Sequence, residues 1–419
     1  MIDTIVTNQA TVPSGLARYF FFKLLQRISF GELRVIERLA DGQEQLTVVG
    51  EAAATPVGSI TLSILDNRCF GLIMLGGVNG AAEAFMNGYW STDDLPGLMR
   101  LMLRNRTAMD SMDSLFSRVS RKSAEVWHAM RKNTLSGSRK NISAHYDLGN
   151  DFFRLFLDER MMYSSAHFAQ PELSDAAASA HLSEASADKL DRICRALDLQ
   201  SSDHLLEIGT GWGGMAVYAA EHFGCRVTTT TISNEQFTAA KALVAEHGLE
   251  DRVTVLCEDY RDLTGSFDKL VSIEMVEAVG HQFVDGYFAC IEKLLKPGGT
   301  AVLQAITIED WRYEAAVHSV DFIKRYIFPG SFIPCPSVLI NSAATSGLRL
   351  QRFDDFGLSY AATIQAWAYR FRNALDDVRR QGFDERFIRM WFFYLAYCEG
   401  GFKERSISVA HLTWEKPAS

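Results

Sequence analysis

Five strand-like segments alternate with helix-compatible stretches between residues 204 and 307, and this alternation limits the fold more than any other feature of the sequence. The segments are HLLEI (204–208), RVTTTTI (226–232), RVTVLCE (252–258), FDKLVSIEM (267–275) and TAVLQAIT (300–307). Apolar strands that alternate with helices are typical of a parallel sheet covered by helices on both faces. The sequence therefore predicts a doubly wound α/β fold for this region.

Composition narrows the class of protein. Of 419 residues, 47% are apolar and 22% are charged, which excludes a disordered chain. The formal charge of −9, from 42 basic and 51 acidic residues, does not favour nucleic acid as a partner. Seven dispersed cysteines without CxxC spacing predict neither a disulfide framework nor a metal site. No apolar run approaches about 18 residues and no secretory signal is apparent, so a cytoplasmic protein is expected.

The chain is expected to have three parts. Residues 1–103 mix short alternating runs with glycine turns and predict a small α+β domain, in which Ser91 to Asp94 begin a helix. Residues 104–140 are polar and basic, and they predict a helical connector. Its basic residues fit either a solvated helix face or a patch that meets anionic lipid headgroups: Arg118, Arg121, Lys122, Arg131, Lys132, Arg139 and Lys140. Residues 141–419 would form the main domain, with 308–345 as an aromatic insertion or lid over the strand ends.

A glycine-rich turn follows the first strand-like segment, in LLEIGTGWGG (205–214). Glycines let a ligand approach the backbone closely, and the following helix offers free N–H groups. Glu207 at the strand end would repel a pyrophosphate but suits a cationic ligand. S-adenosylmethionine, which carries an amine and a sulfonium, is therefore the predicted cofactor.

Six motifs occur in order along the chain: HYDLGNDFFRLFLDERMMYSSAHF (145–168), LLEIGTGWGG (205–214), TISNEQ (231–236), CEDYRD (257–262), EMVEAVG (274–280) and FIKRYIFPG (322–330). Together they resemble the cyclopropane-fatty-acid-phospholipid synthase family of S-adenosylmethionine-dependent fatty acyl methyltransferases. AAEAFMNGYWSTDDL (81–95) also resembles the lipid-contacting N-terminal domain of that family. The resemblance implies a class I methyltransferase fold with a smaller N-terminal domain.

The resemblance also implies a reaction. A methyl(ene) group would pass to the cis double bond of an unsaturated phospholipid acyl chain and most often form a cyclopropane ring. Alternatives are a methyl-branched or methylene chain, a small-molecule methyltransferase, and a lipid-binding protein without catalysis. The enzyme would act at the inner face of the membrane as a peripheral protein, with a homodimer as a possible assembly.

Site residues follow from the resemblance position by position. Cofactor contacts would come from Tyr146, Tyr163 and Ser164 over the methionine end, Gly209 and Gly211 beneath it, Thr231, Ser233 and Gln236 at the ribose, and Asp259 and Tyr260 at the adenine. A bicarbonate ion would act as the base, held by Ser165, Glu277, Gln304, the backbone of Ile306, and Tyr360.

Some positions depart from the family pattern. Many members have cysteine at Ser165 and histidine at Gln304, and a variant of the EMVEAVG motif has glycine at Glu274 and histidine at Ala278. The fate of the cation after methylation is therefore left open.

An alkene attacks a sulfonium methyl without prior deprotonation, so this chemistry predicts a dry aromatic tunnel with one buried base. Six further histidines are expected at the surface or at helix caps: His128, His181, His222, His247, His281 and His411.

Overall fold

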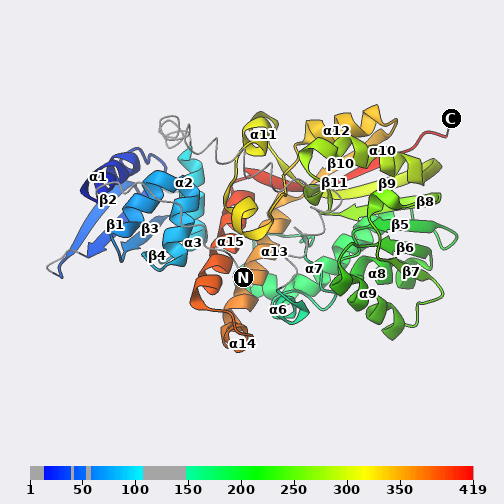
Figure 1. Cartoon of the computed structure of the whole chain (residues 1–419), viewed down its shortest axis with the longest axis horizontal. Coiled ribbons are helices and arrows are strands. Elements are labelled where there is room, and N and C mark those ends of the chain that lie inside the picture. Colours follow the sequence, from blue (N-terminus) through cyan, green and yellow to red (C-terminus); the bar gives the residue numbers. More distant parts are fainter. Residues whose placement is uncertain (1–13, 39–41, 53–57, 107–147, 419) are drawn as a thin grey trace. The chain divides into compact units, whose positions relative to one another are not determined.

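The computed structural model describes residues 14–38, 42–52, 58–106 and 148–418, and the chain divides into two compact units (Figure 1). The N-terminal unit takes in residues 1–120 and 384–397, and the larger unit takes in residues 121–383 and 398–419. Nearly all of the predicted basic connector, including its seven named basic residues, lies outside the described residues. The three-part division of the chain stays a prediction.

The N-terminal unit is a small α+β fold. Its sheet has the strand order β2-β1-β3-β4, in which β1 and β3 are parallel and the other pairs are antiparallel. Its elements are α1 (Ser14–Leu25), β1 (Gly31–Arg38), β2 (Glu44–Glu51), β3 (Ser59–Ile64), α2 (Arg68–Met86), β4 (Trp90–Thr92) and α3 (Leu95–Arg104). The predicted helix start is correct, because the Asp94 carboxylate accepts a hydrogen bond from the Gly97 N–H at 2.8 Å.

The first part of α15 (Glu385–Lys403) belongs to the N-terminal unit, although it is far away in sequence. Arg386 donates to the Glu83 carboxylate at 3.0 Å and to the Asn87 side chain at 2.6 Å. The rings of Phe85 and Phe393 lie 5.9 Å apart. These long-range contacts explain why residues 384–397 group with α2 rather than with the sheet of the larger unit.

Helix α2 is long and apolar enough to cross a membrane, judged by length and composition alone, and it is the one such helix among the described residues. A search for uninterrupted apolar runs does not single out this helix. Gly77 interrupts its helical geometry, with φ 53° and ψ −131°. A core helix of a soluble protein can have the same composition, so α2 assigns no membrane span by itself.

The larger unit is built on a seven-stranded sheet with the order β10-β11-β9-β8-β5-β6-β7 (Figure 1). Five strands are parallel, as predicted, and β11 and β10 add an antiparallel edge. The strands are β5 (His204–Ile208), β6 (Arg226–Thr230), β7 (Val253–Leu256), β8 (Phe267–Ile273), β9 (Leu295–Ile308), β10 (Arg349–Asp355) and β11 (Ile407–Glu415). The doubly wound fold predicted from the alternation is confirmed, whereas β10 was not anticipated.

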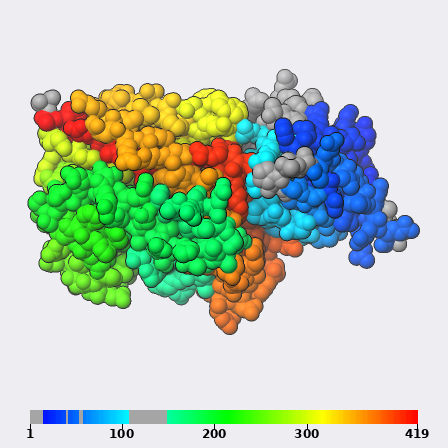
Figure 2. All heavy atoms as spheres, turned by 180° about the vertical axis from the view of Figure 1, so that it is seen from behind, coloured from blue at the N-terminus to red at the C-terminus, as the bar shows by residue number. Residues whose placement is uncertain are grey.

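Helices cover both faces of this sheet because its strands are apolar on both sides. Leu206 packs with α10 and α12 on one face, while Leu205 packs with α7, α8 and α9 on the other. Figure 2 shows the yellow-to-orange segments along one side of this unit and the green segments along the other. The helices are α6 (Asn150–Arg154), α7 (Asp175–Ala196), α8 (Gly214–Phe223), α9 (Asn234–Glu246), α10 (Val284–Leu294), α11 (Asp310–Val317), α12 (Pro336–Thr345), α13 (Gly357–Asn373) and α14 (Leu375–Arg380), with a π-turn at Ile323–Ile327.

The aromatic insertion reaches the carboxyl ends of the strands. Short 3₁₀ turns follow β7 at Tyr260–Asp262 and β8 at Val276–Ala278. The Phe332 N–H, within the insertion, donates to the Glu277 backbone carbonyl at 3.0 Å. In open α/β sheets ligands bind at these strand ends, so this edge is where the site is expected.

Candidate active site

The glycine turn between β5 and α8 is open to a ligand. Gly209, Gly211 and Gly213 all have positive φ, which glycine adopts without strain. The N–H groups of Gly209 and Thr210 both donate to the Thr230 carbonyl and fix the start of the turn. A Cβ added at Gly211 would meet nothing within 4 Å, so the space above this residue is free.

Glu207 lies beneath the turn and is fully buried. Its carboxylate accepts a hydrogen bond from the Thr229 hydroxyl at 2.6 Å, and the Thr210 hydroxyl lies 2.6 Å from that of Thr229. Burial raises the pKa of Glu207 to about 8. A cationic ligand nearby would favour the ionised carboxylate, which agrees with the charge preference predicted from the sequence.

The residues predicted for the ribose lie together after β6. The Thr231 hydroxyl donates to the Gln236 side-chain oxygen at 2.8 Å, and the Ser233 hydroxyl accepts from the Gln236 N–H at 3.3 Å as the cap of α9. All three side chains are buried.

The pair predicted for the adenine follows β7. Both Asp259 oxygens accept hydrogen bonds from the Arg261 guanidinium, at 2.8 and 2.6 Å. The Tyr260 ring lies edge-on to Tyr287, and burial raises the pKa of Tyr260 to about 12. Arg261, which sequence reasoning did not single out, therefore holds the Asp259 carboxylate.

The segment after α6 brings two of its predicted residues into the larger unit's interior. The Tyr163 ring stacks on Trp367 at 5.3 Å, and the Ser164 hydroxyl accepts a hydrogen bond from the Lys189 ammonium at 2.8 Å. Lys189 is completely buried, which lowers its pKa to about 8, while Glu274, Asp158 and Glu207 favour its charge. Tyr146 lies outside the described residues.

Glu274 is the centre of the arrangement, although the sequence reasoning gave it no role. Its carboxylate accepts the Ser165 N–H at 2.8 Å, the Gln304 amide at 2.7 Å and the Tyr360 hydroxyl at 2.6 Å. Three of the five residues predicted to hold an anion thus meet at this side chain. An acid directly after a central strand was the signal that could have identified it.

The backbone at Glu274 is in the left-handed region, with φ 49°. For a residue with a Cβ this conformation costs about 1–2 kcal/mol, and it persists only where the surroundings impose it. The Glu274 N–H donates to the Gln304 carbonyl at 2.7 Å, which continues the pairing between β8 and β9.

Glu277 and Ile306 form the second half of this centre. One Glu277 oxygen accepts the Ile306 N–H at 2.6 Å, and the other is buried without a hydrogen-bond partner. Burial and the neighbouring Glu274 raise the pKa of Glu277 to about 8. Gln304 and Ile306 are two residues apart on β9, so both lie on one face. The centre therefore holds two half-buried carboxyl groups, of which only Glu277 was among the predicted site residues.

His411 was predicted at the surface or at a cap, and this is wrong. It is buried on β11 opposite Gln304, and its Nε2 lies 2.9 Å from the Gln304 side-chain oxygen. Burial lowers its pKa well below the usual value, so the neutral ring donates to the amide. The amide is thereby oriented with its NH₂ toward Glu274.

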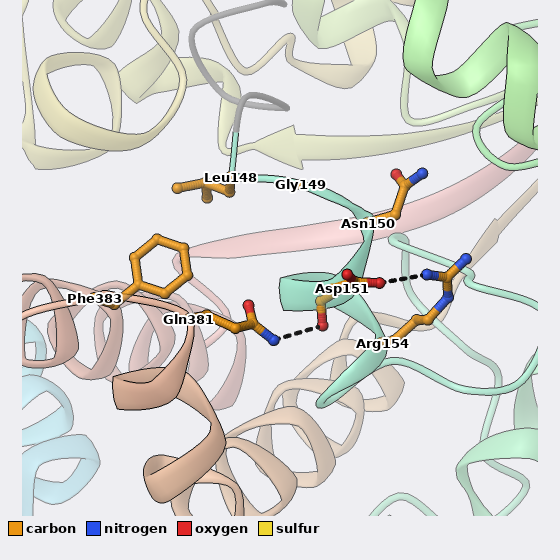
Figure 3. A pocket seen from close by; sticks show the side chains of 7 residues that line it. All are labelled: Leu148, Gly149, Asn150, Asp151, Arg154, Gln381 and Phe383. Atoms are coloured by element: carbon orange, nitrogen blue, oxygen red, sulfur yellow. Dashed lines mark hydrogen bonds and ion pairs between the residues drawn. The ribbon is translucent and has the colours of Figure 1, made fainter.

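A cavity of about 470 Å³ lies at the start of α6 (Figure 3). It is lined by Leu148, Gly149, Asn150, Asp151, Arg154, Gln381 and Phe383. The Asn150 side-chain oxygen accepts a hydrogen bond from the Trp212 indole at 2.7 Å, which joins this wall to the turn.

Comparison with known proteins shows which family this chain belongs to. The family model described as mycolic acid cyclopropane synthetase matches residues 133–412, two thirds of the chain. The chain belongs to the mycolic acid cyclopropane synthetase family. It is an S-adenosylmethionine-dependent methyltransferase, and the reaction of its family is the methylation of lipid acyl chains.

Curated relatives agree with this assignment. The chain is 36% identical to tuberculostearic acid methyltransferase UfaA1 of Mycobacterium tuberculosis, covering 80% of this chain and 78% of the relative. It is 32% identical to cyclopropane-fatty-acyl-phospholipid synthase of Escherichia coli K12, covering 83% and 85%.

Solved structures of the cyclopropane synthases have the same fold as the larger unit. Cyclopropane synthase MmaA2 from Mycobacterium tuberculosis matches with a TM-score of 0.60 and 28% identity, over 66% of this chain and 98% of that chain. Mycolic acid cyclopropane synthase CmaA1, complexed with SAH and CTAB, matches with the same values. The resemblance read from the six motifs is thereby confirmed.

The first prediction for this synthetase-family site concerns Gly211. Gly211→Val should abolish binding of S-adenosylmethionine measured by calorimetry, because a β-branched side chain would fill the free space above the turn. Gly248→Val is the matched control, since Gly248 also has positive φ and open surroundings but lies after α9. Equal loss of binding in both variants, or none in Gly211→Val, would contradict this placement of the cofactor.

The second prediction concerns pH. The raised pKa of Glu277 keeps the folded carboxyl neutral up to about pH 8, whereas the unfolded chain ionises near 4.5. Its stabilisation is complete below pH 4.5 and is lost as pH rises to about 8. Glu277→Gln cannot ionise, so its Tm relative to the parent should increase from pH 5 to pH 8 in thermal scans. Exposed Glu250→Gln should show no such trend. A Tm difference for Glu277→Gln that is constant with pH would contradict a buried neutral carboxyl.

Proposed function

We propose that this chain transfers a methyl group from S-adenosylmethionine to the cis double bond of an unsaturated phospholipid acyl chain, removes one proton from the new methyl group and closes a cyclopropane ring. The observation that carries the proposal is the pair of half-buried carboxyl groups, Glu274 and Glu277, which follow β8 at the carboxyl end of the parallel sheet. Loss of a proton from a methylated hydrocarbon cation needs a base held where water is excluded, and these carboxyl groups supply one.

The residues present fit the cofactor. S-adenosylmethionine supplies an electrophilic methyl on a sulfonium. The open space above Gly211, the buried Glu207 carboxylate and the cluster of Thr231, Ser233 and Gln236 would hold its parts. The glycine turn also lies close to the acidic centre formed by Glu274 and Glu277. A Cβ added at Gly209 would lie 3.2 Å from the side chain of Met275, which stands between these two glutamates in the sequence.

Aromatic rings surround the acidic centre. The Tyr360 ring stacks on Phe402 at 4.4 Å and lies edge-on to Trp367, which in turn stacks on Tyr163. Such rings exclude water, and their negative faces stabilise a nearby cation. These residues would orient the acyl chain and protect the cation until a proton leaves.

A methylene chain is the second candidate product, because the chain is similar to an enzyme named for tuberculostearic acid. A hydride shift in the same cation, followed by loss of the same methyl proton, gives an exocyclic methylene group. A saturated methyl branch would additionally require a hydride and a proton.

Contact with a membrane surface is supported by exposed apolar side chains on two neighbouring helices of the N-terminal unit. Leu16 and Tyr19 are exposed on α1, and Leu75 and Val78 on α2. The helices adjoin each other, since the rings of Phe21 and Phe70 lie 5.2 Å apart. Exposed apolar side chains on adjoining helices are a feature of surfaces that insert into a lipid interface.

The reaction is tested with S-adenosylmethionine that carries a fully deuterated methyl group. Incubated with dioleoyl phosphatidylglycerol vesicles, the protein should yield acyl chains with one extra carbon bearing two deuterium atoms, because one leaves with the base. Mass spectrometry counts the deuterium, and NMR distinguishes a ring from a methylene group. Vesicles of saturated lipid are the control. Retention of all three deuterium atoms, or methylation of the headgroup, would contradict the proposal.

Membrane contact is tested by Tyr19→Ser combined with Leu75→Ser. Each change should weaken sedimentation with anionic vesicles by about 1 kcal/mol, because less apolar area is buried in the lipid. Leu350→Ser, at a partly exposed apolar residue of β10 in the larger unit, is the control. Unchanged sedimentation of the double variant would exclude this surface as the lipid contact.

A further inference from the structure

The backbone and side chain of Glu274 are arranged unlike those of an ordinary acid at a strand end. Its left-handed φ of 49° is imposed immediately after β8, and its half-buried carboxylate accepts three hydrogen bonds. The resemblance stated above puts glycine at this position in one variant of the motif. A carboxylate in place of a glycine therefore adds a negative charge to the interior of the site.

The carboxylate of Glu274 takes up the donors that the family resemblance assigns to bicarbonate. One oxygen accepts from the Ser165 N–H and the Gln304 amide, and the other accepts from the Tyr360 hydroxyl. The remaining donor, the Ile306 N–H, is bound to Glu277. A carboxylate and a bicarbonate present the same planar pair of oxygens. The donors present thus do not fit a separate bicarbonate ion.

We propose that the Glu274 carboxylate replaces bicarbonate as the base that removes the proton from the newly added methyl group. This inference rests on the proposed function. In the step, a methyl C–H bond breaks and an O–H bond forms on Glu274. The electron pair of the C–H bond closes the cyclopropane ring, or forms the methylene double bond after a hydride shift. The proton later leaves to solvent, so no oxidant or reductant is needed.

Glu274 rather than Glu277 carries the charge because of the donors around it. Burial raises the pKa of Glu274, but three hydrogen bonds and the Lys189 ammonium oppose this rise. Glu277 has a single donor besides its own backbone, and one of its oxygens has no partner. Two adjacent carboxyl groups cannot both ionise easily, so Glu277 retains its proton beside the ionised Glu274.

The direct test compares Glu274→Gln with Glu277→Gln on dioleoyl phosphatidylglycerol vesicles. Glu274→Gln should still bind S-adenosylmethionine in calorimetry, but its turnover should fall about 10²–10⁴-fold. Glu277→Gln should lose less, because an amide replaces a carboxyl that is already neutral. Glu250→Gln is the matched control and should match the parent, since this side chain is exposed at the end of α9. Parent-like turnover in Glu274→Gln, or a larger loss in Glu277→Gln, would overturn the proposal.

Glu274→Gly supplies a second and independent readout. Glycine tolerates the left-handed φ, so the variant should fold, and it frees the three donors for a small anion. Its turnover should be low in bicarbonate-free buffer and should recover on addition of bicarbonate, formate or acetate. ¹³C-bicarbonate NMR should detect binding to Glu274→Gly and not to the parent.

Turnover of the unmodified parent protein, measured with and without bicarbonate, distinguishes a failure of this inference from a failure of the proposed function. Its turnover should be the same with and without bicarbonate. A parent that methylates lipid only when bicarbonate is added would overturn the role of Glu274 and leave the proposed function intact. A parent that binds S-adenosylmethionine but methylates no unsaturated lipid would refute the proposed function and the inference with it.

Discussion

The hydrogen bonding of the Glu274 carboxylate is the constraint on which the site depends. A carboxylate inside a protein is stable only when hydrogen bonds replace the water that it has lost. Its three donors come from segments far apart in the chain: the loop at Ser165, strand β9 at Gln304 and helix α13 at Tyr360. Helix α13 packs against α7 and β11, and this packing places the Tyr360 hydroxyl where it donates to the Glu274 carboxylate.

This arrangement gives a physical reason for two departures from the family pattern. Ser165 meets Glu274 through its backbone N–H, while its hydroxyl donates to the Ala166 carbonyl, so a change between serine and cysteine leaves the contact in place. Gln304 donates to Glu274 and accepts from His411, which needs a side chain with both a donor and an acceptor. Both positions can vary without loss of the hydrogen-bond network.

A base that belongs to the chain has a consequence for specificity. A bound anion can exchange with solvent, whereas Glu274 is fixed by its backbone and three hydrogen bonds. Ring closure and methylene formation both break a C–H bond of the new methyl group, but methylene formation needs a hydride shift first. The position of the cation relative to Glu274 would then decide which of the two products forms.

The sequence by itself determined the parallel sheet, the glycine turn and the family, because these depend on local patterns: apolar periodicity, glycines with positive φ, and ordered motifs. It also identified Ser165, Gln304 and Tyr360, but not the group that joins them. Only the tertiary structure decided that Glu274 lies at their centre, that His411 is buried against Gln304, and that part of α15 belongs with α2. These features depend on side chains that meet across long stretches of sequence, and no local pattern encodes the hydrogen bonds and desolvation that bring them together.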